Sequence, residues 1–439
     1  MDNIQKQEAF YNQIAPHNII DVLQFVNERS SFLKAFHPLL QRYSKKLPVN
    51  GELFAVMMAE AMGYGLNSMA DICNIPYHTL QHNYKQFFRD GTLSEANNVL
   101  VNAISELGIY PHYELGFDKR YGSVDGQKYS VEHPTTKARH SKKYFGKGRG
   151  VVAYTLLCNH VPLQTSTISA HDHESYYVFD IAHHNRSSIN PEAISGDMHS
   201  INKANFAILD WFGYLFTPRF TDLSTEIEHV HSGADEQLHS RFLIKPAGKI
   251  DQDLIEEEWP NLRRIMVTLA QKEITQSILM KKLCTYSYSN RTKKALFEYD
   301  RLILSIYTLK YIMDPKLQRQ IQRSQNRIEA YHQLRSAIAQ VGGKKKLSGK
   351  TDIEVEISNQ CGRLIANAII YYNSILLSTL LEIYQANNDE QGMSILSKIS
   401  PVAWRHIYLT GHYFFDNINS GIDLLAVLSN MLLDETTTD

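Results

Sequence analysis

Three acidic residues lie where carboxylates can take part in phosphodiester chemistry. Asp125 is in a strand-like segment, 121–131, although aspartate is disfavoured in strands. Asp197 closes the short strand-like segment 193–196, and strand ends in α/β sheets usually present functional groups. Glu329 is the only acid in a long basic helical segment. Two carboxylates on strands and one on a helix can form an oxygen-lined site for Mg²⁺, because this ion prefers hard oxygen ligands.

Two neighbouring residues are candidates to support such a site. Gly126 would let a phosphate or a metal ion approach the backbone beside Asp125. His332 lies about one helical turn beyond Glu329 and is expected to line the same site or to pack there. A pair of Mg²⁺ ions about 3.5–4 Å apart can activate an attacking oxygen and stabilise a leaving one. Spacing alone, however, does not single out these three carboxylates among the 46 acidic residues of the chain.

The charges of the chain are segregated, although their sum is close to zero. The 439 residues include 45 Lys and Arg against 46 Asp and Glu, a net charge of −1. Residues 119–150 hold nine basic residues and two acids, and residues 316–346 hold eight basic residues and one acid. Residues 221–260, in contrast, hold ten acids and three bases. Basic blocks of this kind suit a polyanion such as DNA, because phosphate contacts supply most non-specific affinity.

The elements that must position these residues are a strand-rich block and long helices. Apolar residues at three- and four-residue spacing predict helices up to about residue 116. Strands and helices then alternate up to residue 220, which indicates α/β or α+β organisation. The expected elements of this block are strands at 121–131, 149–158, 163–169, 193–196 and 214–220, a turn at 159–162, and helices at 169–182 and 203–212. Helices are also predicted across 221–315, at 316–341 and 352–384, and in a shorter tail after Pro401.

Composition excludes several classes of protein. Hydrophobic residues make up 43% of the chain, which is enough to form a core and excludes a wholly disordered chain. Four scattered cysteines are too few for a disulfide scaffold or a Cys-rich zinc module. The polar start has no signal-peptide apolar segment. The most apolar stretch, 364–381, is interrupted by five polar residues, so a buried helix is expected rather than a membrane span. We therefore expect a soluble intracellular protein.

Two other kinds of site, a nucleotide-binding P-loop and a di-iron centre, have partial matches in the sequence. Residues 344–351 approach a P-loop, but Lys344 stands where G-x-x-x-x-G-K-[ST] needs glycine, so a basic loop that faces DNA is favoured and no nucleotide cofactor is expected. Two Glu-x-x-His pairs, at 226–229 and 329–332, have the spacing of a di-iron bundle. The strand-rich block at 121–200 does not suit a four-helix bundle, however, and chance pairs are expected among 19 histidines.

Six segments together resemble the catalytic region of Tn3-family replicative transposases. The resemblance covers roughly residues 115–420. It rests on long, ordered matches at residues 125–129, 137–150, 196–206, 323–339, 358–366 and 400–406. Family members are about twice as long as this chain, with several DNA-end-binding domains before the catalytic region. The chain is therefore expected to be the catalytic C-terminal half of such a protein, as a fragment, a natural truncation or one piece of a split reading frame.

The resemblance implies a DDE transposase with an RNase H-like core that a helical insertion interrupts. It assigns Asp125, Asp197 and Glu329 as the catalytic residues and ligands of two Mg²⁺ ions, which Mn²⁺ can replace. It implies hydrolytic nicking at transposon ends, then attack of the freed 3′-OH on target DNA. The candidate DNA-binding residues are Arg139, Lys142, Lys143, Lys147, Arg149, Lys203, Arg323, Arg327, Lys344 and Lys345.

The organisation expected from these features has five parts. They are a helical N-terminal segment (1–116), the first part of the RNase H-like core (117–220), an acidic helical insertion (221–315), the second part of the core (316–385) and a helical C-terminal tail (386–439). The expected partners are transposon-end DNA, target DNA and a second copy of the chain, with no membrane, in the cytoplasm of a bacterium near the nucleoid. The alternative function is that of a truncated, non-catalytic remnant that binds DNA or full-length transposase and regulates it.

Overall fold

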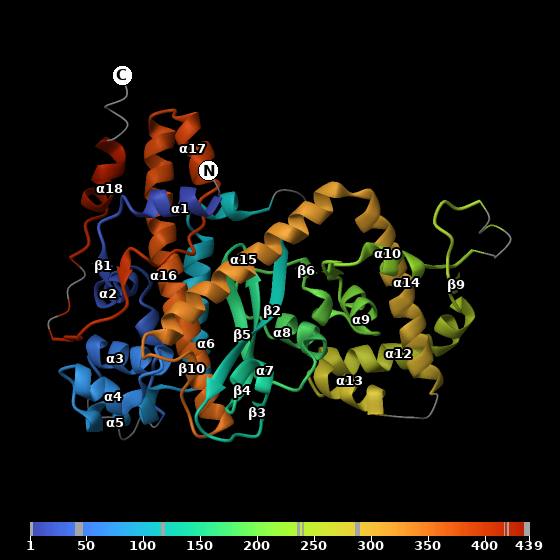
Figure 1. Cartoon of the computed structure of the whole chain (residues 1–439), viewed down its shortest axis with the longest axis horizontal. Helices are drawn as coiled ribbons and strands as arrows, with labels where there is room; N and C mark the ends of the chain where they lie inside the picture. The colour runs from blue at the N-terminus through green and yellow to red at the C-terminus, as the bar shows by residue number, and fades with distance from the viewer. Residues whose placement is uncertain are drawn as a thin grey trace.

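The structure, a computed structural model, combines a seven-stranded mixed sheet and two short strand pairs with many helices (Figure 1). It describes residues 3–39, 47–115, 119–234, 238, 241–285, 290–416, 418 and 421–433. The predicted mixture of helices and strands is confirmed. The predicted boundary at 116/117 lies outside the described residues.

The N-terminal part is helical, as its apolar spacing predicted. Its helices are α1 (Asn3–Tyr11), α2 (Ile19–Ser30), α3 (Asn50–Ala61), α4 (Gly65–Ile72), α5 (Tyr77–Phe87) and α6 (Asp90–Ser105), with 3-10 turns η1 (Phe32–Ala35) and η2 (Tyr110–Tyr113). In α2, the apolar residues at helical spacing are buried on one face. A two-residue strand, β1 (His17–Asn18), interrupts this helical part and pairs in parallel with β11 (Ile407–Tyr408).

The main sheet has β2 at its centre. Its strands are β2 (Tyr121–Val131), β3 (Arg139–His140), β4 (Arg149–Cys158), β5 (Val161–Ser169), β6 (Ala193–Ser195), β7 (Leu215–Phe216) and β10 (Lys346–Leu347). The short helix α7 (Lys142–Phe145) lies between β3 and β4. The β4–β5 hairpin turns at Asn159 and His160, both with positive φ (48° and 70°), as in a two-residue hairpin turn. The turn is therefore shorter than predicted, and Val161 and Pro162 belong to β5.

One edge of β2 is open along part of its length. On this side, β6 pairs only with residues 121–123, and β10 pairs only with residues 130–131. Within the described part of the chain, no strand pairs with residues 124–129 on that side. On the other side β4 pairs with β2 throughout 122–131. The open edge therefore exposes Asp125 and Gly126 between two strand ends.

Short elements and then a group of helices follow the hairpin. They are η3 (Glu174–Tyr177), α8 (Val178–His183), η4 (Met198–Ser200), α9 (Asn205–Trp211), α10 (Leu223–Glu228), α12 (Gln252–Ala270), α13 (Gln276–Thr285) and α14 (Arg291–Met313). The predicted strand at 214–220 shortens to β7, and the predicted helix at 169–182 becomes η3 and α8. The predicted helical region 221–315 also holds two short parallel strands, β8 (His231–Ser232) and β9 (Gly248–Lys249). In Figure 1 α9, α10 and α12–α14 lie together on one side of the sheet.

Two long helices flank the sheet. Asp314 caps α15 (Pro315–Gln340) by accepting hydrogen bonds from two backbone N–H groups of its first turn. Thr351 and Glu354 form a capping box at the start of α16 (Asp352–Ala386). By length and composition α16 could span a membrane, but 94% of its most apolar window is buried inside the protein. It is therefore the core helix that its sequence predicted.

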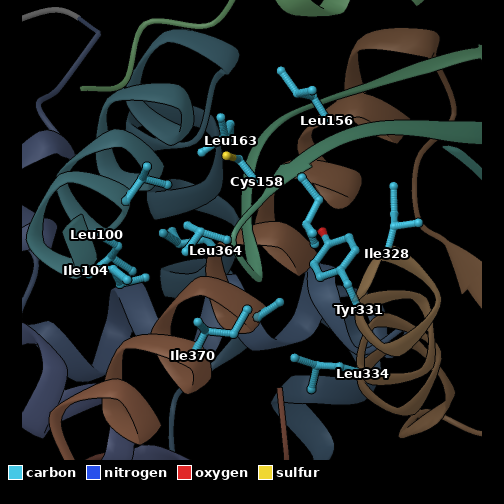
Figure 2. Packing of buried hydrophobic residues seen from close by; sticks show 14 of the residues in the cluster. Leu100, Ile104, Leu156, Cys158, Leu163, Ile328, Tyr331, Leu334, Leu364 and Ile370 are labelled. Atoms are coloured by element: carbon cyan, nitrogen blue, oxygen red, sulfur yellow. The ribbon is translucent and has the colours of Figure 1, made fainter. Parts of the chain in front are cut away.

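The core lies between α16, α15, α6 and the β4–β5 hairpin. Its central side chains are Leu100 and Ile104 from α6, Leu156, Cys158 and Leu163 from the hairpin, Ile328, Tyr331 and Leu334 from α15, and Leu364 and Ile370 from α16 (Figure 2). Burial of this apolar surface fixes α15 and α16 relative to the sheet.

The C-terminal part is helical only in places, which corrects the prediction of a helical tail after Pro401. It contains α17 (Glu390–Leu396), β11 and α18 (Leu424–Leu433). The segment between β11 and α18 runs along the N-terminal helices, where Tyr413 N–H donates to the carbonyl of Ile72 and Phe415 N–H donates to the side chain of Asn74. Backbone groups bonded to another segment in this way cannot form a helical ladder.

Candidate active site

Strand register brings Asp125 and Asp197 together. Ser123 of β2 pairs with Ser195 of β6 in a parallel ladder, and each aspartate follows its serine by two residues. The two carboxylates therefore emerge side by side, where β6 has ended and the edge of β2 is open. Asp197 is held there as the cap of η4, since its Oδ1 accepts a hydrogen bond from the N–H of His199 at 2.9 Å.

Polar contacts fix α15 across the same face of the sheet. Gln325 donates from Nε2 to Oγ of Ser195 at 3.2 Å. One turn beyond Glu329, the carbonyl of His332 accepts a hydrogen bond from Gln127 Nε2 at 2.6 Å. Because these two contacts lie on either side of Glu329 along the helix, they place it above the region of Asp125 and Asp197.

An open cleft of about 620 Å³ joins the strand and the helix. Its lining includes Asp125, Gly126, Lys128, Glu329 and His332. Glu329 is exposed, whereas Asp125 is about 20% exposed at its side chain. Asp197 stands beside this cleft rather than in its lining. Among the residues that the structure describes, no three His, Cys, Asp or Glu side chains lie close enough to hold one ion. Asp125 and Glu329 therefore line the cleft and Asp197 lies beside it, and the three carboxylates are not close enough together to form one cluster of ligands.

The electrostatics of Asp125 favour a cation at this opening. Burial, and after it the charges of Glu174, Asp197 and Glu329, together raise the pKa of Asp125 to about 7. Its one resolved hydrogen bond to the backbone, from the N–H of Gly126 at 2.8 Å, acts in the opposite direction. The residues fit a hard divalent cation, since the donors are carboxylate oxygens and an ion would offset their mutual repulsion.

His332 lies in the cleft as predicted, but it does not offset this charge. Its Nδ1 is 3.5 Å from Oδ2 of Asp125. Burial and then the charges of Lys345, Arg335 and Lys128 lower the pKa of His332 to about 3, so it is neutral near pH 7. Its Nε2 is buried without a hydrogen-bond partner. Asp125 therefore has no cationic partner in His332.

Glu174 is a fourth acid at this site that sequence reasoning missed. Its carboxylate lies against Gly126, where a Cβ would come within 2.4 Å of Oε1 of Glu174. Burial raises the pKa of Glu174. The available signal was Gly126 itself, because a glycine inside a strand often marks the close approach of another group. Nothing in the local sequence indicated which group that would be.

Most of the predicted DNA-binding residues are exposed. They are Arg139, Lys142, Lys143, Lys147, Arg149, Lys203, Arg323 and Lys344. Arg149 pairs with Val131 on β2, six residues from Asp125, which corresponds to about 20 Å along the strand. Arg323 lies on α15 six residues before Glu329, much closer to the opening.

Two of the predicted DNA contacts face the protein instead. Arg327 donates from Nη1 to the carbonyl of Tyr113 at 2.5 Å and to Asn159 at 3.4 Å, and burial lowers its pKa to about 10. Its guanidinium thus links α15 to η2 and the hairpin turn, which corrects its assignment to DNA. Lys345 is half-buried, with its Nζ 5.0 Å from the centre of the Tyr129 ring, and it acts on His332 rather than on an exposed surface.

Neither a di-iron site nor a P-loop is supported by the described residues. No group of three potential metal ligands includes either Glu-x-x-His pair. Residues 346–347 form β10, and Thr351 caps α16 with its side chain. This segment is therefore a strand and a helix cap.

Comparisons with known proteins identify the family. The family model of the Tn3 transposase DDE domain matches residues 21–413. The transposase for transposon Tn2501 of Escherichia coli is 25% identical over 93% of this chain and 41% of its own length. The transposase for transposon Tn1546 of Enterococcus faecium is 26% identical over the same two shares. The transposase for transposon gamma-delta of Escherichia coli is 26% identical over 92% of this chain and 40% of its own length.

The chain therefore spans about two fifths of the length of the curated relatives it matches. A cryo-EM structure of a piggyBac transposase synaptic complex with hairpin DNA covers 74% of this chain and 85% of its own, at 12% identity and a TM-score of 0.24, which is too low to support a conclusion. The family match includes all three carboxylates at the opening and nearly the whole described core. The resemblance seen in the sequence is confirmed: the chain belongs to the Tn3 transposase DDE domain family.

Proposed function

We propose that this chain catalyses metal-dependent nicking of DNA at transposon ends and transfer of the resulting 3′-OH into target DNA, as in replicative transposition. What supports this proposal is the placement of Asp125, Asp197 and Glu329 around the open edge of β2, from two strands and one helix, in a chain of the DDE family. The proposed architecture is an RNase H-like core, 117–220 with 316–385, interrupted by the helical insertion 221–315.

In this proposal Asp125, Asp197 and Glu329 hold two Mg²⁺ ions, with Mn²⁺ as a substitute. Bound divalent ions supply Lewis-acid activation of the attacking oxygen and neutralise the phosphate charge. The chain orients Asp125 through the N–H of Gly126 and Asp197 through the N–H of His199. The contacts of Gln325 and Gln127 keep Glu329 above them.

The basic residues bind the DNA backbone in two regions. Arg323 would contact phosphates beside the cut, and the segment from Arg139 to Arg149 would contact the duplex about 20 Å away. Such contacts position DNA without selecting its sequence. The proposed partners are transposon-end and target DNA and a second copy of this chain, in the bacterial cytoplasm.

The test is a nicking assay on supercoiled plasmid DNA that carries the transposon ends, with and without Mg²⁺. We expect Mg²⁺-dependent nicks, and their loss in Asp125→Asn while DNA binding, measured by fluorescence anisotropy, is unchanged. Asp222→Asn, which alters the exposed cap of α10, is the matched control and should nick normally. Unchanged nicking by Asp125→Asn would refute the assignment. DNA binding without nicking by the unaltered chain would favour the non-catalytic regulator.

A further inference from the structure

Glu174 is an acidic residue close to Asp125 that is not one of the three carboxylates assigned through the family resemblance. Gly126 pairs directly with Tyr154 of β4, so the side-chain positions of both residues lie on one face of the sheet. Glu174 reaches this face from η3, and its carboxylate fills the space that a side chain at 126 would need: a Cβ there would meet its Oε1 at 2.4 Å and its Cδ at 2.5 Å. The absence of a side chain at Gly126 thus brings the carboxylate against the backbone of the residue that follows Asp125.

Two further observations concern the polar surroundings of the Glu174 carboxylate. The hydroxyl of Tyr154 is buried without a hydrogen-bond partner, on a side chain only 1% exposed. Tyr154 shares the face of the sheet on which Glu174 lies, and among the charges that, after burial, raise the pKa of this hydroxyl that of Glu174 is the largest, ahead of those of Asp125 and Asp197. The Nζ of Lys128 lies 4.0 Å from Oε1 of Glu174. A cation is therefore already placed beside Glu174.

Lys128 also borders the catalytic cleft. It lines the same cleft as Asp125 and Glu329, its side chain is 31% exposed, and its Nζ lies 4.3 Å from the centre of the exposed Tyr144 ring. The Lys128–Glu174 separation of 4.0 Å is at the outer limit of an ion pair and lacks a tight hydrogen bond. Such a lysine can leave its carboxylate at low cost when a phosphate offers a stronger partner.

We propose that Glu174 is a fourth carboxylate of the cation site, and that Lys128 serves as its counter-ion until a divalent cation and DNA phosphate bind. This inference rests on the proposed function and adds two residues to its site. The divalent cation takes over the charge of Glu174, and Lys128 is released toward the DNA backbone. The two residues should therefore affect cation affinity in opposite directions. Without the Glu174 carboxylate the site attracts a divalent cation less strongly, and without the Lys128 ammonium group no positive charge competes with the cation for Glu174.

The test measures Mn²⁺ binding to the full chain without DNA, by the electron paramagnetic resonance signal of free Mn²⁺. We expect Glu174→Gln to weaken Mn²⁺ binding by roughly tenfold or more, the usual effect of losing a group at or beside a metal site. We expect Lys128→Gln to tighten it by about fivefold, the effect of removing one nearby positive charge. Asp172→Asn breaks an ion pair with Lys281 at 2.8 Å, two residues before Glu174. It is the matched control and should leave Mn²⁺ affinity unchanged.

The outcomes separate this inference from the proposed function. Unchanged Mn²⁺ affinity in Glu174→Gln, with loss of binding in Asp125→Asn, would overturn the role of Glu174 alone. No loss of binding in Asp125→Asn would count against the metal site itself. A weaker affinity in Lys128→Gln would show that the pair only stabilises the fold, and would overturn the counter-ion role. If Glu174→Gln fails to fold, as judged by circular dichroism, Lys128→Gln still tests the proposal because it leaves the carboxylate in place.

Discussion

Replacement of Asp125 by asparagine is expected to stabilise the folded chain near and above neutral pH, and not in acid. Burial is the largest cause that raises the pKa of Asp125 from 3.8 to about 7, and the charges of Glu174, Asp197 and Glu329 add to it. In the unfolded chain Asp125 has its ordinary pKa of 3.8. Between these two values the unfolded state binds fewer protons than the folded state, so stability falls as the pH rises from about 4 to about 7 and is constant above.

The size of the effect follows from the shift. At about 1.36 kcal/mol for each pH unit, the full shift corresponds to a cost of about 4 kcal/mol. Because the Asp125 side chain is 20% exposed, solvent screening reduces the expected gain in Asp125→Asn to about 2 kcal/mol. An asparagine keeps an oxygen that can accept the hydrogen bond from Gly126.

The assay is urea denaturation of the unaltered chain and Asp125→Asn at pH 4.5 and pH 8, followed by circular dichroism. The variant should be the more stable form at pH 8, and the difference should largely disappear at pH 4.5. Addition of Mg²⁺ at pH 8 should stabilise only the unaltered chain, because the cation offsets the repulsion that the variant has already lost. A variant less stable than the unaltered chain at pH 8, or a difference independent of pH, would refute this reasoning.

Four further predictions concern residues at the site and on the basic surface. Gly126→Ala should lose about 1–3 kcal/mol of stability in urea denaturation, because the new Cβ overlaps a carboxylate, whereas Gly91→Ala, where nothing lies within 4 Å, should lose none. Arg149→Gln should reduce the slope of the logarithm of the DNA association constant against the logarithm of salt concentration by about one, because one phosphate contact is lost. Arg327→Gln should leave that slope unchanged and lower the melting temperature; a change in the salt slope would return this arginine to the DNA interface. Gln325→Leu should slow nicking by roughly tenfold to a hundredfold with unchanged DNA affinity, since it releases α15 from β6, and normal nicking would show that this contact does not position the site.

Local patterns predicted the long elements of the fold accurately. Strand β2, the β4–β5 hairpin, α15 and α16 agree with prediction to within a few residues. Strand β4 has a nearly continuous apolar run, and α15 and α16 have apolar residues at helical spacing and clear N-terminal caps. The short elements could not be predicted as well. β7 and β11 have two residues each and exist only because another strand lies beside them, so neither has a periodic pattern of its own.

Side-chain roles depended on contacts between distant segments. Arg327 and Arg323 are alike in type and lie on the same basic helix. Only the packing of α15 against η2 and the hairpin turn distinguishes the buried arginine from the exposed one. Glu174 is likewise an ordinary acid in the sequence, and it becomes part of the site through a contact with a residue 48 positions earlier.

The amino-acid sequence by itself determined the family and the order of the long helices and strands, since ordered residue types along the chain carry that information. The three carboxylates were predicted only through the resemblance to that family. The tertiary structure decided which charges act on one another. The register of β6 on β2 sets Asp197 beside Asp125, and the missing side chain of Gly126 admits Glu174. Charge interactions depend on distance and burial rather than on separation along the chain. The two basic blocks in the sequence favoured a DNA partner although the net charge is −1, and only the fold showed which carboxylates lie close to Asp125.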